Sequence, residues 1–391
     1  MARIGIYGGT FNPPHVGHIR AAQYAVSALN LERLLLIPSC ISPHKTLPEN
    51  SPTPEQRLEM LRIATQGTQI EISDIELQRG GTSYTYETVA QLKEQYPQDE
   101  LIFFMGTDMF LSFDKWRYPE KITEKASLGV LYRGEKGEKE TISQQKNLLE
   151  TRGAKVYLVE NPITEISSTE LRRLITFRCA EDFLPRGVGE YIAQQGLYAP
   201  NCENLTEAQL EQVVTSLLKP NRIKHVLGCR DTAVELAKRW GADETAAARA
   251  GLLHDITKAL TDRQQLTLCE KYGIILDRFS YTNPKTLHAL TGSLVAERIF
   301  GENEDVVAAI ASHTTGKKNM NTLEKVIYVA DYMEPNRDFP GVEELRRLAM
   351  EDLDKALKLG LMMTIKLLKE QDREISPESK QALEDLEQVA I

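Results

Sequence analysis

The strongest constraint on the fold is a change of pattern near the middle of this 391-residue chain. From Met1 to about Tyr198, short apolar runs typical of strands alternate with amphipathic helical stretches. Beyond a turn-rich connector at residues 196–204, the strand patterns stop and helical patterns continue toward the C-terminus. Alternating strands and helices predict a doubly wound parallel sheet, and helices alone predict an all-α domain. The sequence therefore predicts a Rossmann-like α/β domain at 1–198, a linker at 199–205 and an all-α domain at 206–391.

Apolar runs and helical periodicity locate the elements of each half. The expected strands are Arg3–Tyr7, Leu34–Ile37, Ile70–Asp74, Leu101–Met105, Leu128–Tyr132 and Lys155–Val159. The expected helices between them are Gly17–Leu29, Pro54–Thr65, Tyr84–Gln95, Ser143–Thr151 and Ser168–Ile175. In the second half, helices are expected at Thr206–Leu218, Arg222–Trp240, Asp243–Leu260, Asp262–Tyr272, Pro284–Phe300, Asp305–His313, Thr322–Met333 and from about Val342 to Asp372. Because ligands of doubly wound sheets bind beyond the carboxyl ends of the strands, functional residues are expected directly after strands.

Composition restricts the partners and the compartment. The formal net charge of −9 argues against a general surface for nucleic acid or anionic membranes, so local cations must hold any phosphate ligand. Five scattered cysteines without a C-x-x-C pair argue against a disulfide framework and a zinc ribbon, and fit a cytoplasmic protein. We expect no signal peptide and no membrane span, because the sequence shows neither a basic leader followed by an apolar core nor a sufficiently long apolar run.

The turn after the first expected strand carries the densest group of candidate site residues, in the run G-G-T-F-N-P-P-H-V-G-H from Gly8 to His18. A strand, a Gly/Pro-rich turn and a helix in this order present backbone N–H groups and a helix dipole to an anion. Two histidines three residues apart in this turn indicate an anion that undergoes chemistry. We therefore predict that His15 and His18 are catalytic, and that Gly8, Gly9, Thr10 and Phe11 bind substrate.

Four later segments carry side chains suited to the same site. Lys45 in the P-H-K loop offers a mobile charge to a phosphate, although a lone lysine is more often simply a surface residue. Hydroxyls in the G-T-S-Y-T run can cap a helix or bind a planar ligand, an aspartate after G-T can bind ribose hydroxyls, and a tryptophan can stack on a base or pack in the core. The I-S-S-T-E-L-R run opens a helix with an arginine one turn in, which suits a triphosphate as well as simple capping. The predicted residues are Lys45, Thr82, Tyr84, Thr85, Gly106, Asp108, Trp116, Ser168 and Thr169 for substrate binding, and Arg172 for catalysis.

Taken in order, these motifs resemble the bacterial nicotinate-nucleotide adenylyltransferase family, within the H-x-G-H nucleotidylyltransferase superfamily. The resemblance implies transfer of AMP from ATP to nicotinate mononucleotide, giving deamido-NAD and pyrophosphate, with Mg²⁺ accompanying ATP. It also implies that both histidines serve the phosphates and that residues 82–85 and Trp116 hold the pyridine ring. Asn12 departs from the aspartate that is usual in the family, and we expect a change of geometry there without loss of activity. The rival is a sister enzyme, such as a phosphopantetheine adenylyltransferase or a cytidylyltransferase; the G-T-S-Y-T run and the Ser168–Arg172 helix weigh against it.

Histidines and aspartates on successive expected helices predict a metal site in the second half. The candidate ligands are His225, His254, Asp255, His288, His313 and Asp331. Neutral imidazoles with carboxylates bind Fe, Mn, Co or Zn, whereas a structural zinc site would use thiolates. Four of these residues suffice for one ion. His288 and His313 supply enough further ligands for a second ion, with Asp255 as the natural bridge.

The order H…HD…H…H…D resembles the HD-domain metal phosphohydrolases. The runs H-D-x-x-K, S-H-T-T-G and A-D-Y-M-E-P-N-R resemble the YqeK group in particular, over residues 206–391. The resemblance implies symmetrical cleavage of diadenosine tetraphosphate to two ADP, with iron as the favoured metal. Lys258 is predicted to be catalytic and Arg337 to bind the polyphosphate, although a helix-surface lysine explains Lys258 equally well. The alternatives are a different HD nucleotide phosphohydrolase and a non-catalytic nucleotide sensor.

The expected ligands are therefore ATP, nicotinate mononucleotide and diadenosine tetraphosphate or a related nucleotide. The sequence leaves the oligomeric state open, with a homo-oligomer among the options.

Overall fold

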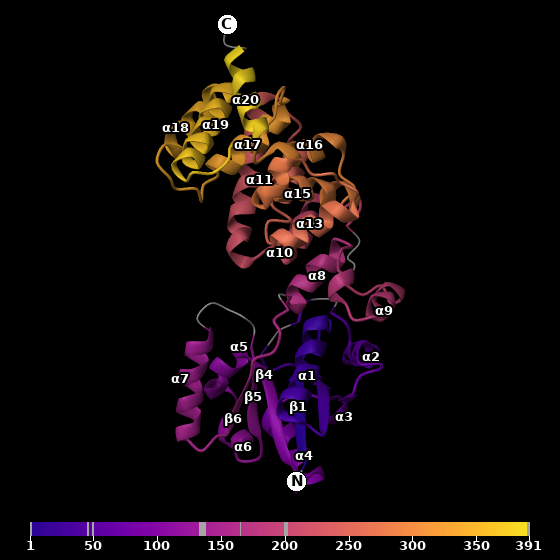
Figure 1. The fold of residues 1–391 in the computed structure, drawn as a ribbon. Helices are drawn as coiled ribbons and strands as arrows, with labels where there is room; N and C mark the ends of the chain where they lie inside the picture. Colours follow the sequence, from indigo (N-terminus) through magenta and orange to yellow (C-terminus); the bar gives the residue numbers. More distant parts are fainter. Residues whose placement is uncertain are drawn as a thin grey trace. The chain divides into compact units, whose positions relative to one another are not determined.

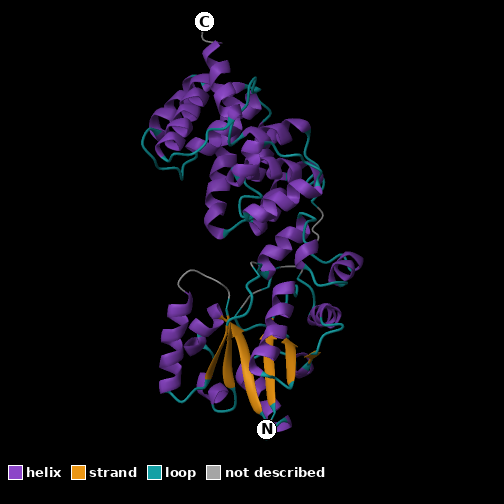
Figure 2. Ribbon diagram, in the orientation of Figure 1, coloured by secondary structure: helices purple, strands orange, loops and turns teal. Residues whose placement is uncertain are grey.

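The computed structural model describes residues 2–44, 47–48, 51–132, 138–164, 166–198 and 202–388. They form two compact units, Met1–Ala199 and Pro200–Ile391, each described by itself. Figure 1 labels the helices and strands, and Figure 2 shows the strands in the first unit and helices throughout the second. None of the helices in the described segments is long and apolar enough to cross a membrane. The predicted fold class, an α/β half followed by an all-α half, is confirmed.

The first unit is built on one parallel sheet (Figure 2). Its strands lie side by side in the order β3-β2-β1-β4-β5-β6. The strands are β1 Arg3–Gly9, β2 Arg33–Pro38, β3 Ile70–Ile72, β4 Glu100–Gly106, β5 Ser127–Leu131 and β6 Val156–Val159. Ile4 in β1 pairs with Arg33 on one side and with Leu101 on the other. The chain thus winds outward from β1 to β3 and then returns to β4 on the other side. This reversal places the topological switch point, where doubly wound folds bind their ligands, between the carboxyl ends of β1 and β4.

Helices cover both faces of this sheet because alternate strand residues point to opposite faces. Leu35 and Phe103 pack on one face with α4 and α7, whereas Leu36 and Phe104 pack on the other with α1, α2 and α9. The helices are α1 Val16–Leu29, α2 Pro54–Ala64, α3 Ile75–Arg79, α4 Thr85–Gln95, α5 Thr107–Leu111, α6 Pro119–Thr123, α7 Glu138–Thr151, α8 Ser168–Thr176 and α9 Val188–Gln194, with the 3-10 turns η1 Phe113–Lys115 and η2 Glu181–Phe183. Periodicity does not predict α3, α5, α6 or α9, because helices this short do not complete a recognisable pattern.

The second unit consists of helices packed around a buried polar cluster. They are α10 Glu207–Leu217, α11 Pro220–Trp240, α12 Glu244–Leu253, α13 Asp262–Lys271, α14 Arg278–Thr282, α15 Leu287–Arg298, α16 Glu304–Ser312, α17 Thr322–Met333, α18 Val342–Glu351, α19 Leu353–Glu370 and α20 Pro377–Gln388, with the 3-10 turn η3 Pro284–Thr286. The single helical region expected from Val342 to Asp372 is two helices. Asp352 separates them, because its backbone is extended and its side chain accepts a hydrogen bond from the Lys355 N–H, capping α19.

Candidate active sites

The first candidate site lies at the switch point of the sheet, where the chain leaves β1. A cavity of about 420 Å³ opens there, lined by the segments that follow β1, β2 and β4 and by the first turns of α4 and α8. The predicted residues that line it are Gly8, Gly9, Thr10, Phe11, His18, Thr85, Gly106, Trp116, Ser168, Thr169 and Arg172. Motifs that lie far apart in the sequence therefore meet at one cavity.

His15 and His18 form a stacked pair at the N-terminus of α1. Their ring centroids are 3.6 Å apart with planes inclined by 27°, and the backbone N–H of His15 donates to Nδ1 of His18 over 3.2 Å. Because Nδ1 of His18 accepts this bond, the neutral imidazole carries its proton on Nε2. His18 lines the cavity, whereas His15 is buried beside it. Gly17 permits the close packing, since a Cβ at that position would lie 2.9 Å from Nδ1 of His15.

A buried arginine that the sequence motifs do not reveal holds the turn after β1. Arg57 on α2 is 1% exposed and donates to the carbonyl oxygens of Thr10 and Ser39, over 2.7 Å in each case. Burial lowers the pKa of its guanidinium group, but arginine stays protonated at neutral pH. The residue therefore fixes the turn after β1 to the segment after β2.

The start of α8 is bonded to the same turn. Ser167 is the actual N-cap, accepting a hydrogen bond from the Glu170 N–H, so the next two hydroxyls are available for other contacts. The hydroxyl of Ser168 donates to the carbonyl oxygen of Pro13 over 2.9 Å. Arg172 donates to the carbonyl oxygen of Asn12 over 2.7 Å. Its guanidinium group and the N-terminus of α8 therefore border the cavity together, as an anion-binding site requires.

Aromatic side chains line another part of the cavity. Trp116 lies there beside His44, with ring centroids 4.9 Å apart. Ser83 joins the two neighbouring segments, since its N–H donates to the carbonyl oxygen of Ile41 and its hydroxyl accepts from the N–H of Cys40, both over 2.9 Å. Flat aromatic walls of this kind suit a heteroaromatic ring.

The structure shows which side chains of the G-T-S-Y-T run line the cavity. Ser83 and Thr85 line the cavity, whereas Thr82 and Tyr84 do not. The run therefore reaches the cavity through Ser83 and through Thr85, the first residue of α4. A role of Thr82 and Tyr84 in substrate binding stays a prediction.

Asp108 and Lys45 are also predicted to bind substrate at this site. Asp108 does not line the cavity, because it projects to solvent from the first turn of α5. Lys45 lies outside the described residues. Glu76 is a lining residue that the sequence motifs miss; it is buried and accepts a hydrogen bond from the Thr88 hydroxyl over 2.6 Å.

The second candidate site is the polar cluster at which α11, α12, α15, α16 and α17 meet. Two groups of three side chains, with ligand atoms within 4.8 Å of one another in each group, are His225, His254 and Asp331, and Asp255, His288 and His313. Oδ2 of Asp255 lies 3.6 Å from Nε2 of both His225 and His254. Its Oδ1 lies 3.4 Å from Nε2 of His288 and 3.8 Å from Nε2 of His313. Asp255 thus turns one oxygen to each group, as a carboxylate shared between two ions would.

The orientation of the four imidazoles fits metal binding. Nδ1 donates to the carbonyl oxygens of Gly251, Lys285 and Ile310 in His254, His288 and His313, and to the Glu334 carboxylate in His225. In the neutral form each ring would therefore direct its Nε2 lone pair away from the Nδ1 partner, and the Nε2 atoms of His225 and His254 lie 3.2 Å apart. Two lone pairs at this distance repel each other, whereas a cation bound between the two nitrogens would attract both. Burial lowers the pKa of His254 to about 4 and that of His288 to about 3, which keeps both rings in the neutral form that binds metals.

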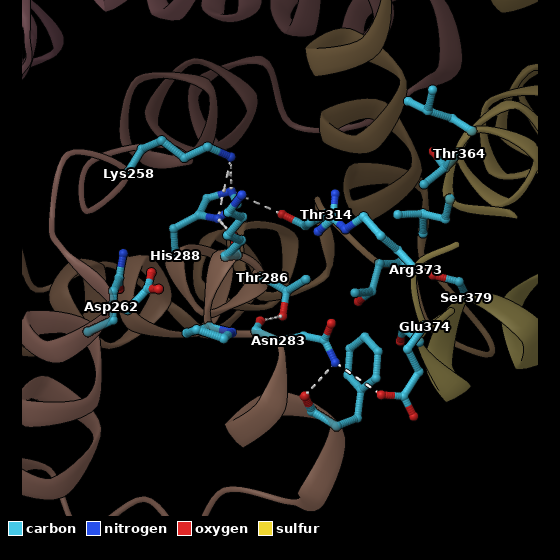
Figure 3. A pocket seen from close by; sticks show the side chains of 18 of the residues that line it. Lys258, Asp262, Asn283, Thr286, His288, Thr314, Thr364, Arg373, Glu374 and Ser379 are labelled. Carbon is cyan, nitrogen blue, oxygen red and sulfur yellow. Dashed lines mark hydrogen bonds between the residues drawn. The ribbon is translucent and has the colours of Figure 1, made fainter. Parts of the chain in front are cut away.

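Cationic side chains surround the two carboxylates of this cluster. Arg222 donates from Nε to Oδ2 of Asp255 over 2.6 Å, and Arg337 donates to Oδ1 of Asp331 over 2.6 Å. Nζ of Lys258 lies 3.9 Å from Oδ1 of Asp255 and borders a cavity of about 420 Å³ (Figure 3). The side chains of Lys258 and Arg337 therefore both lie at the cluster.

Some of these residues lie outside the helices on which the sequence predicts them, and two others are not predicted. His254 and Asp255 follow the end of α12, since the helix expected to continue to Leu260 ends at Leu253, and His313 is the C-cap of α16. Arg222 and Glu334 are not among the predicted residues. Their spacing could have identified them. Arg222 lies three residues before His225 and Glu334 three residues after Asp331, so each projects to the same side of the chain as its neighbour.

Known protein families match both halves. The cytidylyltransferase-like family matches residues 6–174, and the HD domain family matches residues 222–336. "Probable nicotinate-nucleotide adenylyltransferase" of Dictyoglomus thermophilum is 37% identical over 198 residues, which are 50% of this chain and 99% of that protein. "Bis(5'-nucleosyl)-tetraphosphatase, symmetrical" of Halalkalibacterium halodurans is 40% identical over 169 residues, which are 43% of this chain and 90% of that protein.

One relative aligns with both halves together. "Probable nicotinate-nucleotide adenylyltransferase/Ap4A hydrolase" of Mycoplasma pneumoniae is 29% identical over 374 residues, which are 93% of this chain and 98% of that protein. Each of the two matched segments contains one of the two sites: the cavity at the switch point lies in the first unit, and the histidine–aspartate cluster lies in the second. The chain belongs to the nicotinate-nucleotide adenylyltransferase family through its first half, and to the HD-domain family of symmetrical bis(5'-nucleosyl)-tetraphosphatases through its second half.

Proposed function

We propose that the first site transfers AMP from ATP, bound with Mg²⁺, to nicotinate mononucleotide, giving deamido-NAD and pyrophosphate. The observation that carries this proposal is the stacked His15–His18 pair at the switch point, in a cavity that the first turn of α8 also lines. The nicotinate preference is supported by the aromatic wall of His44 and Trp116 and by the names of the relatives.

The reaction needs no covalent intermediate. The phosphate of the mononucleotide attacks the α-phosphorus of ATP, and the bond to the departing pyrophosphate breaks in line with the attack. His18 donates its Nε2 proton as a hydrogen bond to a phosphate oxygen, with His15 holding the ring in that orientation. Arg172 and the N–H groups that begin α8 neutralise the departing pyrophosphate. Catalysis is then positioning plus neutralisation of the charge that develops.

His18→Ala tests this assignment. Removing one donor to developing charge should lower the rate of pyrophosphate release by about 10²–10³. Hydrolysis by the second unit and the thermal unfolding profile should be unchanged, which shows that the variant is folded. Near-wild-type turnover would rule out the proposed role. Comparing nicotinate with nicotinamide mononucleotide as substrates then tests the specificity.

For the second site, we infer that two divalent transition-metal ions bind and that diadenosine tetraphosphate is cleaved symmetrically to two ADP. The carrying observation is that Asp255 faces both groups of ligands, one oxygen to each. Iron is the favoured metal, with manganese, cobalt and zinc as alternatives. Bound ions would supply positive charge and activate water for hydrolysis. Lys258, Arg222 and Arg337 would neutralise the polyphosphate and hold it at the cluster.

Metal analysis followed by a product assay tests the second proposal. The metal-loaded chain should convert diadenosine tetraphosphate to ADP alone, with neither ATP nor AMP among the products. Deoxynucleoside triphosphates, mononucleotides and cyclic dinucleotides should be poorer substrates. Faster hydrolysis of one of these would assign the unit to another HD phosphohydrolase. Binding without turnover of any of them would favour the sensor.

We further propose that residues 1–198 and 206–391 are separate catalytic domains joined by 199–205. Both domains would handle adenylyl groups on polyphosphates. We expect the hydrolase domain to remove adenylylated by-products of the adenylyltransferase domain, or a stress nucleotide. If the two domains mixed as separate chains give the same product profile as the fused chain, this advantage of fusion does not exist.

A further inference from the structure

The segment that follows α17 places two side chains against predicted metal ligands. α17 ends at Met333, and Glu334 comes directly after it. The Glu334 carboxylate accepts the Nδ1–H of His225 over 3.1 Å. Three residues further on, Arg337 donates to Oδ1 of Asp331 over 2.6 Å. Both contacts therefore depend on the course of the backbone from residue 333 to residue 337.

Arg346 holds this backbone from another helix. It lies on α18, and its Nε donates to the carbonyl oxygen of Met333 over 2.9 Å. Its Nη2 donates to the carbonyl oxygens of Glu334 over 3.0 Å and of Arg337 over 2.9 Å. The last carbonyl oxygens of a helix have no partners within the helix, and a planar guanidinium group can bond several of them at once. One side chain therefore fixes both ends of the segment.

The contacts around the Glu334 carboxylate leave it little freedom. Its Oε2 accepts a hydrogen bond from the N–H of Asn336 over 2.7 Å and another from Nδ2 of Asn336 over 2.8 Å. The same Nδ2 donates to the carbonyl oxygen of Lys224 on α11 over 3.1 Å. A Cβ at Gly228, also on α11, would collide with Oε2. The carboxylate therefore fits in one place, with Oε1 on His225, only while the backbone of its own segment stays fixed.

Arg346 differs in its contacts from the next residue of α18. Arg347 pairs with Glu344 and Glu351 of its own helix, and all three side chains are more than half exposed. Nη1 of Arg346 pairs with Glu343, whose side chain is 81% exposed, and such a pair contributes little. The HD domain match ends at residue 336, so α18 lies beyond the segment that supplies the metal ligands. The bonds from Arg346 to the three carbonyl oxygens are thus a support from outside that segment.

We propose that Arg346 is a positioning residue for the metal site. By fixing the backbone of residues 333–337, it keeps the Glu334 carboxylate on Nδ1 of His225, so that Nε2 of this ring is directed at a bound ion. The proposal rests on the proposed two-metal site of this unit. Loss of an outer partner of a ligand typically lowers metal affinity by about 10–100-fold. Arg346 acts one step further from the ion than Glu334, so we expect a loss of about tenfold.

Arg346→Ala and Arg346→Lys in the full chain, loaded with Mn²⁺, test the proposal. Manganese per chain is measured by inductively coupled plasma mass spectrometry after dialysis against increasing concentrations of a chelator. Arg346→Ala should release one ion at an about tenfold lower chelator concentration, while the other ion follows the wild-type curve. Arg346→Lys keeps the charge and a donor, so its curve should lie between the two. Arg347→Ala is the matched control and should follow the wild type. Circular dichroism and adenylyl transfer should be unchanged in all three variants.

Glu334→Gln shows whether Arg346 acts through that carboxylate. Adding Arg346→Ala to Glu334→Gln should lower manganese affinity by much less than Arg346→Ala does alone, because contacts within one network are not additive. Fully additive losses would overturn the proposal, as would wild-type release from Arg346→Ala or joint loss of both ions.

The wild-type curve separates this proposal from the two-metal assignment. If the wild type holds a single ion, the two-metal assignment falls. Release of that ion from Arg346→Ala at about tenfold lower chelator concentration would still support the positioning role, and release at the wild-type concentration would refute it. A wild type that binds no manganese refutes both.

Discussion

The hydroxyl of Tyr198 donates a 2.6 Å hydrogen bond to Oδ1 of Asn12, joining the end of the first unit to the turn that carries His15 and His18. Asn12 is 2% exposed, and its Nδ2 donates to the hydroxyl of Ser51 over 3.2 Å. Both sides of the amide are therefore used, each by a different segment. An aspartate, which is usual in the family, would keep the acceptor for the Tyr198 hydroxyl and lose only the donor to Ser51. The asparagine in this chain is therefore accommodated.

Tyr198→Phe removes this bond and leaves a buried amide oxygen without its partner. The first unit should lose about 1–3 kcal/mol of stability, and the rate of pyrophosphate release should fall by about tenfold as the turn loosens. Thermal unfolding and a pyrophosphate assay measure the two effects. Asn12→Asp is the matched variant: it keeps the acceptor, so it should stay close to wild type in rate. If Tyr198→Phe is as active and as stable as wild type, the bond does not position the turn.

Gly17→Ala should separate stability from activity in the first unit. Gly17 is the second residue of α1 and has an ordinary helical backbone, so alanine causes no backbone strain there. The added Cβ would lie 2.9 Å from Nδ1 of His15, however, and must displace the ring that stacks on His18. We expect pyrophosphate release to fall at least about tenfold with little change in melting temperature. Wild-type turnover in this variant would show that the stack is dispensable.

Asp255→Asn should reduce the content of both ions, because the carboxylate faces both ligand groups. His313→Ala removes a ligand from one group only and should leave the other ion in place. Metal content per chain, measured by inductively coupled plasma mass spectrometry after dialysis, distinguishes the two. Adenylyl transfer by the first unit serves as the internal control. Equal losses in the two variants would mean that Asp255 does not act as a shared ligand.

Glu334→Gln should weaken metal binding without removing a ligand. The carboxylate accepts the Nδ1–H of His225 over 3.1 Å, which sets the tautomer and strengthens Nε2 as a donor to metal. Loss of such a partner typically lowers metal affinity by about 10–100-fold. Competition with a chelator measures the change. Glu343→Gln, at a carboxylate that is 81% exposed, should have wild-type affinity. A Glu334→Gln variant that resists the chelator like wild type would exclude this role.

The sequence predicts the elements well where one local pattern determines them. All six strands and the long helices carry apolar periodicity that a window of residues reveals, and the histidines fall in recognisable runs. Arg57 and Tyr198 show no such signal, because they act on Thr10 and Asn12 through contacts between segments far apart in the chain.

Side-chain direction is the other part that local patterns leave undetermined. The G-T-S-Y-T run locates the segment, but whether Thr82 or Ser83 faces the cavity depends on how that segment is bonded to Cys40 and Ile41.

The order in which the bonds to Asn12 become available has a consequence for synthesis of the protein. Chains emerge from the ribosome starting at the N-terminus, so His15 and His18 appear among the first residues. Their turn acquires its contacts with Arg172 and Tyr198 only after 160 and 186 further residues have followed Asn12. A partly made chain can therefore contain the H-x-G-H run while lacking the side chains that hold its turn. We expect a nascent or truncated chain that ends before Tyr198 to lack adenylyl transfer.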